Sequence, residues 1–455
     1  MQLPFHLCHR RLFSTFLMLK LVSLSLFFTD VVWAQSAPEV LSVGVSQSAV
    51  DTVWIVTAGA LVFFMQAGFA LLEAGMSRSK NAVNVIMKNY TDACMGSLIF
   101  WMVGYGLMFG TNSTGVFGQD NFMPDTMAAT DYTFLFFQMM FAATAVTIAS
   151  GAMAERTNYF AYLIGAVCIT GFIYPIYGSW VWGSNYEGQG WLSQLGFIDF
   201  AGSTVVHSIG AWVALAGIMI LGPRLGRFSK TGTPHEIPGH NLTFMSLGGF
   251  ILWFGWFGFN GGSTVAASED IGLIVLNTQL SAAAAVTSLV MINGILKQPI
   301  YASQVVNACL GGLVAITAGC ATMTPGYAVI TGFIAGFVLK AGMNLLERLR
   351  IDDVVGAVSV HGFCGVWGTL AAGLFLTGNL FDPKQILVQS AGILAAVLWA
   401  LPLSFVMYWI IDKTVGLRVS SNDERRGLDY TEHYELAYPE FQDNLLPNEH
   451  VKHRR

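Results

Sequence analysis

The sequence contains few charged residues. Only 11% of its 455 residues are Asp, Glu, Lys or Arg, whereas 54% are apolar; soluble domains carry roughly 25% charged residues. Such a chain cannot cover a water-facing surface, so lipid must contact most of it. This excludes a soluble globular protein, and the net charge of −5 says less about partners than the positions of the charges do.

The sequence also lacks paired cysteines. None of its six cysteines forms a CxxC pair, and five of them lie in apolar runs. We therefore expect small core residues, with no disulfide framework, no metal site and no cofactor. The cysteines are Cys8, Cys94, Cys168, Cys309, Cys320 and Cys364.

The first residues have the pattern of a targeting segment. Two arginines and a lysine precede the apolar run 21–28, and the small residues of "VWA" (32–34) offer a cleavage point before Gln35. The pattern predicts a cleaved signal peptide over residues 1–34. The alternative is an uncleaved first membrane span.

Eleven apolar stretches follow Gln35, each near the 20 residues that a helix needs to cross a bilayer. They predict an all-α integral membrane protein with eleven transmembrane helices over residues 45–411. The predicted spans are 50–73, 90–110, 132–154, 159–181, 202–222, 242–262, 271–294, 299–320, 326–345, 355–377 and 389–411.

The basic residues fall in alternate connections between these spans. Cytoplasmic connections carry an excess of Lys and Arg, so this set should face the cytoplasm. The remaining connections are acidic and contain Lys384 as their one basic residue. An odd number of spans then places the mature N-terminus outside and residues 412–455 inside as a cytoplasmic tail. The basic set is Arg78, Lys80, Lys88, Arg156, Arg224, Arg227, Lys230, Lys297, Arg348, Arg350 and the tail from Lys413 onward.

One apolar segment recurs. "DFAGSTVVHSIGAW" begins at Asp199 and "DVVGAVSVHGFCGVW" begins at Asp353, and in each the Asp precedes a histidine, His207 or His361, by eight residues. The charge pattern has the two copies enter the membrane from opposite sides, as in inverted-topology repeats, whose substrate sites lie near the midplane. We therefore predict a 5+5 inverted repeat with halves at about 50–222 and 242–377, plus one extra helix at about 389–411.

The two histidines should meet at the middle of the membrane. Eight helical residues rise about 12 Å, and the hydrocarbon core is about 30 Å thick. An ionisable group at that depth is a candidate functional residue. The imidazoles could relay protons or hydrogen-bond a small polar solute, whereas two ligands are too few for a metal. The alternative is a pair of neutral core histidines.

Aromatic residues gather toward the outer ends of several spans. They occur in "FFQMMF" (136–141), "WVWG" (180–183) and "FGWFGFNGGS" (254–263), with Asp199 nearby. Many of them fit the ordinary aromatic belt of a membrane interface. The functional alternative is a site for a weakly hydrated cation, because aromatic faces attract such ions.

At these residues the sequence resembles the ammonium transporter family (Amt/Mep/Rh), and within it the bacterial Amt branch. The resemblance covers about residue 45 to Tyr438. Its most specific pieces are "GAMAER" (151–156), "DFAGSTVVH" (199–207), "WFGFNGGS" (256–263), "VHGFCGVWG" (360–368) and "GLDYTEHYELAY" (427–438).

The resemblance implies an ammonium transporter of the cell membrane, built as a homotrimer with one narrow apolar pore per protomer. Phe141, Trp182 and Ser263 would form the outer ammonium site, with Asp199 structural or supporting the cation from behind. Phe141 and Phe259 would stack as the gate. The pore histidines would be His207 and His361, sharing a hydrogen bond.

The resemblance also implies a mechanism and a partner. Ammonium would lose its proton near the outer mouth, ammonia would cross, and the proton would travel separately by way of the histidines. The tail would pack on the cytoplasmic face and couple protomers, and a PII-type signalling protein blocks that face in many relatives. No nucleic-acid partner is expected.

Two departures from the family pattern affect these expectations. The segment "GSNYEGQGWLSQLGFI" (183–198) is longer than in several relatives, and Gly356 stands where some relatives carry an acidic residue. The alternatives within the family are a neutral-gas channel of the Rh type and an ammonium sensor. More distant alternatives are an intramembrane enzyme, which would lack a nucleophile, and a potassium channel, which would lack a carbonyl filter.

Overall fold

The structure is a computed structural model that describes residues 46–183 and 190–441. The predicted signal peptide (1–34), part of the long segment before Asp199 and the last residues of the tail lie outside the described residues. The described residues form helices and two isolated bridges, with no strand.

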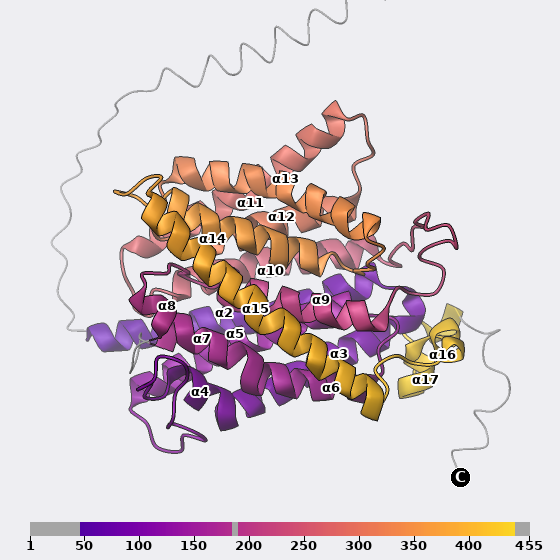
Figure 1. The fold of residues 1–455 in the computed structure, drawn as a ribbon, viewed down its shortest axis with the longest axis horizontal. Helices are drawn as coiled ribbons and strands as arrows, with labels where there is room; N and C mark the ends of the chain where they lie inside the picture. Colours follow the sequence, from indigo (N-terminus) through magenta and orange to yellow (C-terminus); the bar gives the residue numbers. More distant parts are fainter. Residues whose placement is uncertain (1–45, 184–189, 442–455) are drawn as a thin grey trace, which may run out of the picture. The chain divides into compact units, whose positions relative to one another are not determined.

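The helices follow the predicted order of spans (Figure 1). Four spans contain a π-helical turn, labelled η3, η4, η6 or η7. The elements are α2 Gln47–Met76, η2 Ser79–Asn81, α3 Ala82–Ile99, η3 Phe100–Gly104, α4 Tyr105–Phe109, α5 Ala129–Ala152, α6 Tyr159–Cys168, η4 Ile169–Ile173, α7 Tyr174–Trp182, α8 Trp191–Gln194, η6 Ser203–Ser208, α9 Ile209–Leu221, α10 Leu242–Gly262, α11 Asp270–Ile295, α12 Ala302–Thr317, α13 Pro325–Arg348, η7 Val358–Phe363, α14 Cys364–Leu374, α15 Pro383–Thr414, α16 Ser421–Arg426, α17 Leu428–His433 and η8 Pro439–Phe441.

Nine helical stretches among the described residues are long and apolar enough to cross a membrane, and two shorter apolar helices, Ala302–Thr317 and Val358–Leu374, occupy the other predicted spans. Most boundaries lie within a few residues of prediction. The second span was predicted wrongly: it was expected at 90–110, but its helix covers Ser79–Phe109. Lys88 was therefore misplaced in a connection; it lies within α3 and is fully buried.

Close helix packing builds the interior. A Cβ on Gly75 would lie 2.5 Å from Met245 N, and one on Gly248 would lie 2.5 Å from Leu72 N, so α2 and α10 approach at backbone distance. Small residues permit such approach between membrane helices. α5 is buried along most of its length, whereas α15 crosses obliquely and packs on α9 and α14 (Figure 1).

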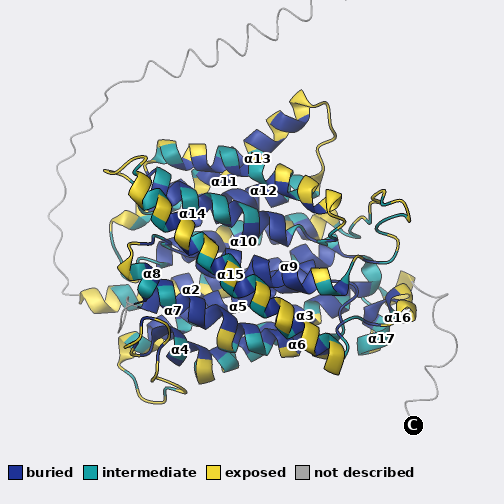
Figure 2. Cartoon of the chain, in the orientation of Figure 1, coloured by how far each residue is buried: buried dark blue, intermediate teal, exposed yellow. Residues whose placement is uncertain are grey.

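The outer faces of the helices are apolar. Figure 2 shows exposed positions alternating with buried ones along α15, and its exposed side chains include Leu387, Leu394 and Leu398. Such a surface is stable against lipid but not in water. Cys309, Cys320 and Cys364 are buried as predicted, whereas Cys94 is exposed on α3, contrary to the prediction of a core residue.

The two histidine segments lie antiparallel. Thr204 Oγ1 lies 2.5 Å from Thr369 Oγ1, a Cβ on Gly365 would lie 2.5 Å from Ser208 Oγ, and a Cβ on Gly362 would lie 3.2 Å from Ala211 Cβ. As the numbers rise on one segment they fall on the other. Each half-helix therefore brings its histidine to the shared contact from the opposite direction.

The tail packs on the ends of α3 and α6. Leu428 N donates to Asn81 Oδ1 at 2.9 Å and Asn84 N donates to Asp429 Oδ1 at 2.8 Å. Tyr159 N donates to Glu432 Oε2 at 3.2 Å. The segment 421–441 is thus held by specific contacts instead of lying free in solvent.

Candidate functional site: an aromatic and histidine path between two cavities

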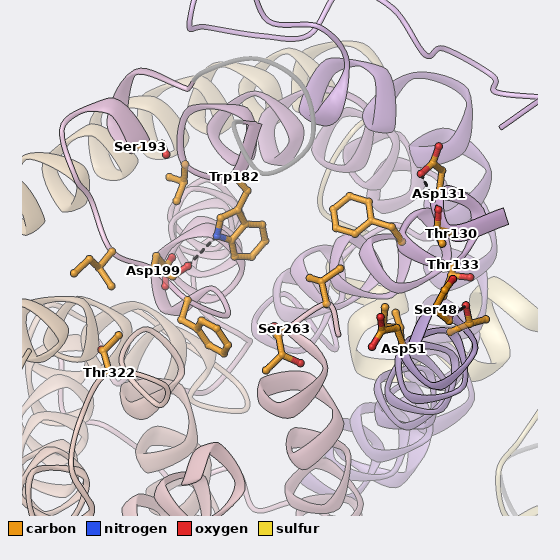
Figure 3. Close-up of a pocket in the computed structure, with 18 of the residues that line it drawn as sticks. Ser48, Asp51, Thr130, Asp131, Thr133, Trp182, Ser193, Asp199, Ser263 and Thr322 are labelled. Carbon is orange, nitrogen blue, oxygen red and sulfur yellow. Dashed lines mark hydrogen bonds between the residues drawn. The ribbon is translucent and has the colours of Figure 1, made fainter. Parts of the chain in front are cut away.

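A cavity of about 690 Å³ lies at the end of the bundle that the charge pattern places outside. Trp182, Asp199 and Ser263, all predicted site residues, line it (Figure 3). Asp51 and Asp131 also line it, although no motif in the sequence singled them out. The cavity therefore combines an indole ring, several hydroxyl groups and three acidic side chains, a set that suits a cation.

The Asp199 carboxylate is tied to the backbone of the following segment. It accepts hydrogen bonds from the N–H groups of Gly202 (3.2 Å), Thr204 (2.9 Å) and Val205 (2.8 Å). Trp182 Nε1 donates to the Asp199 carbonyl at 2.8 Å (Figure 3). Burial raises the pKa of Asp199 to about 6, against the backbone donors, which lower it. Asp199 therefore caps η6 and positions the indole.

Ser263 ends α10 at the cavity wall. Its Oγ donates to the carbonyl of Phe259 at 2.9 Å, as a hydroxyl near a helix end commonly does. Because the single O–H proton is used in this bond, the oxygen lone pairs remain as acceptors. The side chain can thus accept an N–H from a solute in the cavity.

Phe141 and Phe259 lie next to Trp182, farther into the bundle. Their rings stack with centroids 4.0 Å apart and an interplanar angle of 20°, and Phe141 also meets Trp182 edge-on at 6.1 Å. Both phenylalanines are almost fully buried. Stacked rings leave no space between their faces.

His207 and His361 form the next step of the path. Their Nδ1 atoms lie 3.2 Å apart, and His207 lies 5.4 Å from Phe259 and 5.0 Å from Trp256 between ring centroids. Two facing Nδ1 atoms at hydrogen-bond distance require one donor and one acceptor, so the pair shares one proton between them. His207 Nε2 is buried and has no hydrogen-bond partner among the described residues.

A second large cavity lies at the opposite end, where the basic residues gather. It measures about 510 Å³, and its lining includes Arg224, Asp352 and Asp353. Arg224 holds the pKa of Asp352 well below its usual range, although burial alone would raise it. Arg224 also pairs with Glu155 at 2.7 Å. This buried ion-pair network lies at the end of the bundle where the basic residues gather.

Asp353 repeats the role of Asp199 at this end. Its carboxylate accepts from the N–H groups of Gly356 (3.0 Å), Ala357 (3.0 Å) and Val358 (2.8 Å). Sequence reasoning omitted it from the site residues, although the eight-residue spacing to His361 was the available signal. Trp256 was also omitted; nothing in the sequence distinguishes it from the neighbouring ring residues of α10.

The path contains no cluster with metal-binding character. Among residues 46–183 and 190–441, no group of three His, Cys, Asp or Glu side chains lies close enough to hold a metal ion. Three of the seven predicted site residues line the first cavity, and the other four, including Phe141, lie buried behind it. In order the seven are Asp199, Ser263, Trp182, Phe141, Phe259, His207 and His361.

Known proteins resemble this chain along most of its length. The profile of the Ammonium Transporter Family matches residues 53–438. Ammonium transporter Amt2 of Archaeoglobus fulgidus is 43% identical over 420 residues, which cover 86% of this chain and 89% of that protein. A putative ammonium transporter of Synechocystis sp. is 42% identical over 422 residues, covering 90% of this chain and 93% of the relative.

Solved structures are also similar to this chain. A structure described as a sensor Amt protein has a TM-score of 0.83 and 41% identity, covering 85% of this chain and 99% of that one. Mep2 of Candida albicans has a TM-score of 0.75 and 29% identity, covering 82% of this chain and 87% of that one. These relatives are transport-family membrane proteins and not enzymes, and the chain belongs to the ammonium transporter family.

Proposed function

We propose that this protein carries ammonium nitrogen across the membrane by separating ammonium into ammonia and a proton. The continuous path from the outer cavity through Trp182, Phe141 and Phe259 to His207 and His361 is the observation that supports this proposal. The path is lined by rings and contains one shared imidazole proton. That combination suits a small neutral base better than a hydrated ion.

Recruitment takes place at the outer cavity. Ammonium donates one N–H to Ser263 Oγ, and its charge lies against the faces of Trp182 and Phe141, an attraction of about 2 kcal/mol when water is excluded. The carboxylate of Asp199, already engaged with the backbone, adds negative potential behind the indole. The Phe141 and Phe259 rings must then part, because their faces are in contact.

The apolar path determines which species crosses. Moving a bare ammonium ion into such surroundings costs tens of kcal/mol, whereas ammonia carries no charge. The proton therefore leaves ammonium at the outer side and passes by way of the His207–His361 pair. Potassium is rejected because it has no proton to give up.

The test is a current measurement in proteoliposomes. An ammonium jump should give a saturating current with the wild-type protein, and potassium and sodium jumps should give none. His207→Ala and His361→Ala should each lower the ammonium current by at least about tenfold or admit potassium. His235→Ala is the matched control, because His235 is exposed on a connection away from the path. If both pore variants kept normal flux and normal rejection of potassium, the relay would be wrong.

A sensor is the second candidate function. The similarity to the sensor Amt protein spans 99% of that chain, so the same fold is also compatible with ammonium binding that is not followed by fast transport. A wild-type protein that binds ammonium saturably but gives neither current nor internal alkalinisation would favour the sensor. Alkalinisation without current would instead favour a passive channel.

The assembly and orientation proposed here extend the family resemblance to this chain. We propose a homotrimer in the cell membrane, with eleven spans arranged as an inverted repeat, the mature N-terminus outside and the tail in the cytoplasm. The antiparallel contact between Thr204 and Thr369 supports the repeat. A PII-type protein is proposed to bind at the inner cavity, and its absence from pull-downs after an ammonium shock would remove that partner.

A further inference from the structure

A small cavity lies against the inner histidine. Its volume is about 20 Å³, enough for one water molecule, since a single water needs roughly 10–15 Å³. The two titratable side chains among its described lining residues are His361 and Glu73. The remaining lining is apolar apart from Asn307, so a proton that leaves His361 on this side has one titratable acceptor.

Glu73 belongs to a buried polar cluster that the proposed transport path does not use. Asn89 Nδ2 donates to Glu73 Oε2 at 3.0 Å. Lys88 Nζ donates to the Ser150 carbonyl at 3.1 Å and lies 5.1 Å from the centre of the Tyr162 ring. Each of these interactions lies between α2, α3, α5 and α6 and is closed to solvent.

Asp92 is the second carboxylate of the cluster. It accepts hydrogen bonds from Thr147 Oγ1 at 3.3 Å and from the hydroxyl of Tyr162. Glu73 likewise has two side-chain partners, the Asn89 amide and the Ser150 hydroxyl.

The cluster has one more carboxylate than it has cations. Glu73 and Asp92 carry two negative charges when both are ionised, whereas Lys88 carries one positive charge. The second negative charge would then be uncompensated in a buried cluster, which is strongly unfavourable. The nearest other charges are committed elsewhere: Glu155 pairs with Arg224, and Arg156 donates to backbone carbonyls. The cluster therefore has the capacity to bind one additional proton, and Glu73 is the carboxylate that lines the cavity beside His361.

The small cavity also adjoins the inner cavity. Asn307 and Val355 line both of them, and Asn307 Nδ2 donates to the Val355 carbonyl at 2.9 Å across the shared wall. A proton held at Glu73 is thus one side-chain layer from the inner cavity of about 510 Å³.

We propose that Glu73 is the inner proton acceptor of the histidine pair, an inference that rests on the proton separation in the proposed function. The His361 imidazolium releases a proton through one water molecule to the Glu73 carboxylate, which leaves a neutral imidazole and a carboxylic acid. The acid then releases the proton to water in the inner cavity and returns to the carboxylate. Lys88 stabilises the carboxylate between cycles.

The experiment compares Glu73→Gln with Asp92→Asn in proteoliposomes. Each variant removes one carboxylate from the same cluster, and each leaves Lys88 with one counterion. Glu73→Gln keeps an oxygen that can accept from Asn89, so the fold is expected to persist. The two readouts after an ammonium jump are the current and the alkalinisation reported by a trapped pH dye, with elution volume and melting temperature as checks on folding.

We expect Glu73→Gln to lower the current by at least about tenfold, while ammonia that crosses without its proton raises the internal alkalinisation above that of the wild type. Asp92→Asn should keep most of the current, and Glu73→Asp should restore part of it. A Glu73→Gln current close to that of the wild type would overturn the inference, as would an equal loss in a folded Asp92→Asn protein. A wild-type protein without current would instead show that the proton separation itself is wrong.

Discussion

The two histidine segments have the same backbone and different surroundings. In both, an Asp carboxylate accepts from three backbone N–H groups of the residues that begin the half-helix. In both, a glycine with a positive φ angle makes the turn between the Asp and the half-helix. These glycines are Gly202 (108°) and Gly356 (80°). These shared features stabilise the backbone, because the first N–H groups of a helix that starts inside the protein need hydrogen-bond acceptors.

The surroundings of the two imidazoles differ. His207 contacts both Trp256 and Phe259 and is fully buried. His361 borders the small cavity that Glu73 also lines. The comparison teaches that a common scaffold can hold one imidazole among rings, where only a neutral solute is favourable, and the other beside a carboxylate that can take a proton.

The largest expected effect tests the shared scaffold. Asp199→Ala and Asp353→Ala should each destabilise the protein by about 2–4 kcal/mol, because three buried N–H groups lose their acceptor. The two losses should be similar, since the two caps make the same bonds. Thermal unfolding of the purified protein measures both.

The control for this pair is Asp382→Ala. Asp382 caps the exposed start of α15 by accepting from Lys384 N at 3.0 Å, and water can replace it there, so the loss should be smaller. A much larger loss for Asp199→Ala than for Asp353→Ala would show that the caps are not equivalent.

The sequence predicted the backbone of the two histidine segments better than the side chains that surround the two imidazoles. Spans of about 20 apolar residues and the repeated Asp-to-His spacing are local signals, and they placed His207 and His361 on opposite half-helices. The start of the second span was missed because Lys88 read as a residue of a polar connection. Only the packing of α3 against α2 and α6 shows that the charges of Lys88 and Asp92 compensate one another inside the bundle.

The contacts of the candidate site were likewise predicted only in part. The stacked Phe141 and Phe259 and the contact between the histidines were expected from the family resemblance, which carries information about distant contacts. The stacking of Trp256 on His207 and the cavity between His361 and Glu73 depend on how α10 and α2 are rotated about their axes. No periodicity in a helix that is apolar all round specifies that rotation.

The second prediction concerns the two glycines. A Cβ on Gly202 would lie 2.7 Å from Val206 Cγ2 and 3.1 Å from the Trp182 ring, whereas one on Gly356 would lie 2.6 Å from Asn307 Nδ2. Gly202→Ala should cost about 2–3 kcal/mol and weaken ammonium recruitment, because a ring and a branched side chain resist displacement.

Gly356→Ala should cost less, about 1–2 kcal/mol for the left-handed backbone, because the end of the Asn307 side chain can move. The melting temperature and the ammonium concentration for half-maximal current measure both variants. Gly272→Ala, on a helix with no neighbour within 4 Å, is the control and should cause no loss. If Gly356→Ala shifted ammonium recruitment more than Gly202→Ala, the assignment of the outer site to the Asp199 segment would be wrong.

The smallest expected effect tests the contact that joins the two segments. Thr204 and Thr369 lie with their Oγ1 atoms 2.5 Å apart in a fully buried position. In a double-mutant cycle of Thr204→Val and Thr369→Val, the coupling should be about 0.5–1 kcal/mol, the usual range for a hydrogen bond between membrane helices. A cycle of Thr204→Val with Thr287→Val should give no coupling, because Thr287 bonds within its own helix at an exposed position. Coupling in the first cycle alone would mean that the antiparallel register of the two half-helices, and with it the meeting of the two imidazoles, is held directly by this bond. No coupling in either cycle would mean that the register depends instead on other contacts between the two segments, such as the close packing at Gly362 and Gly365.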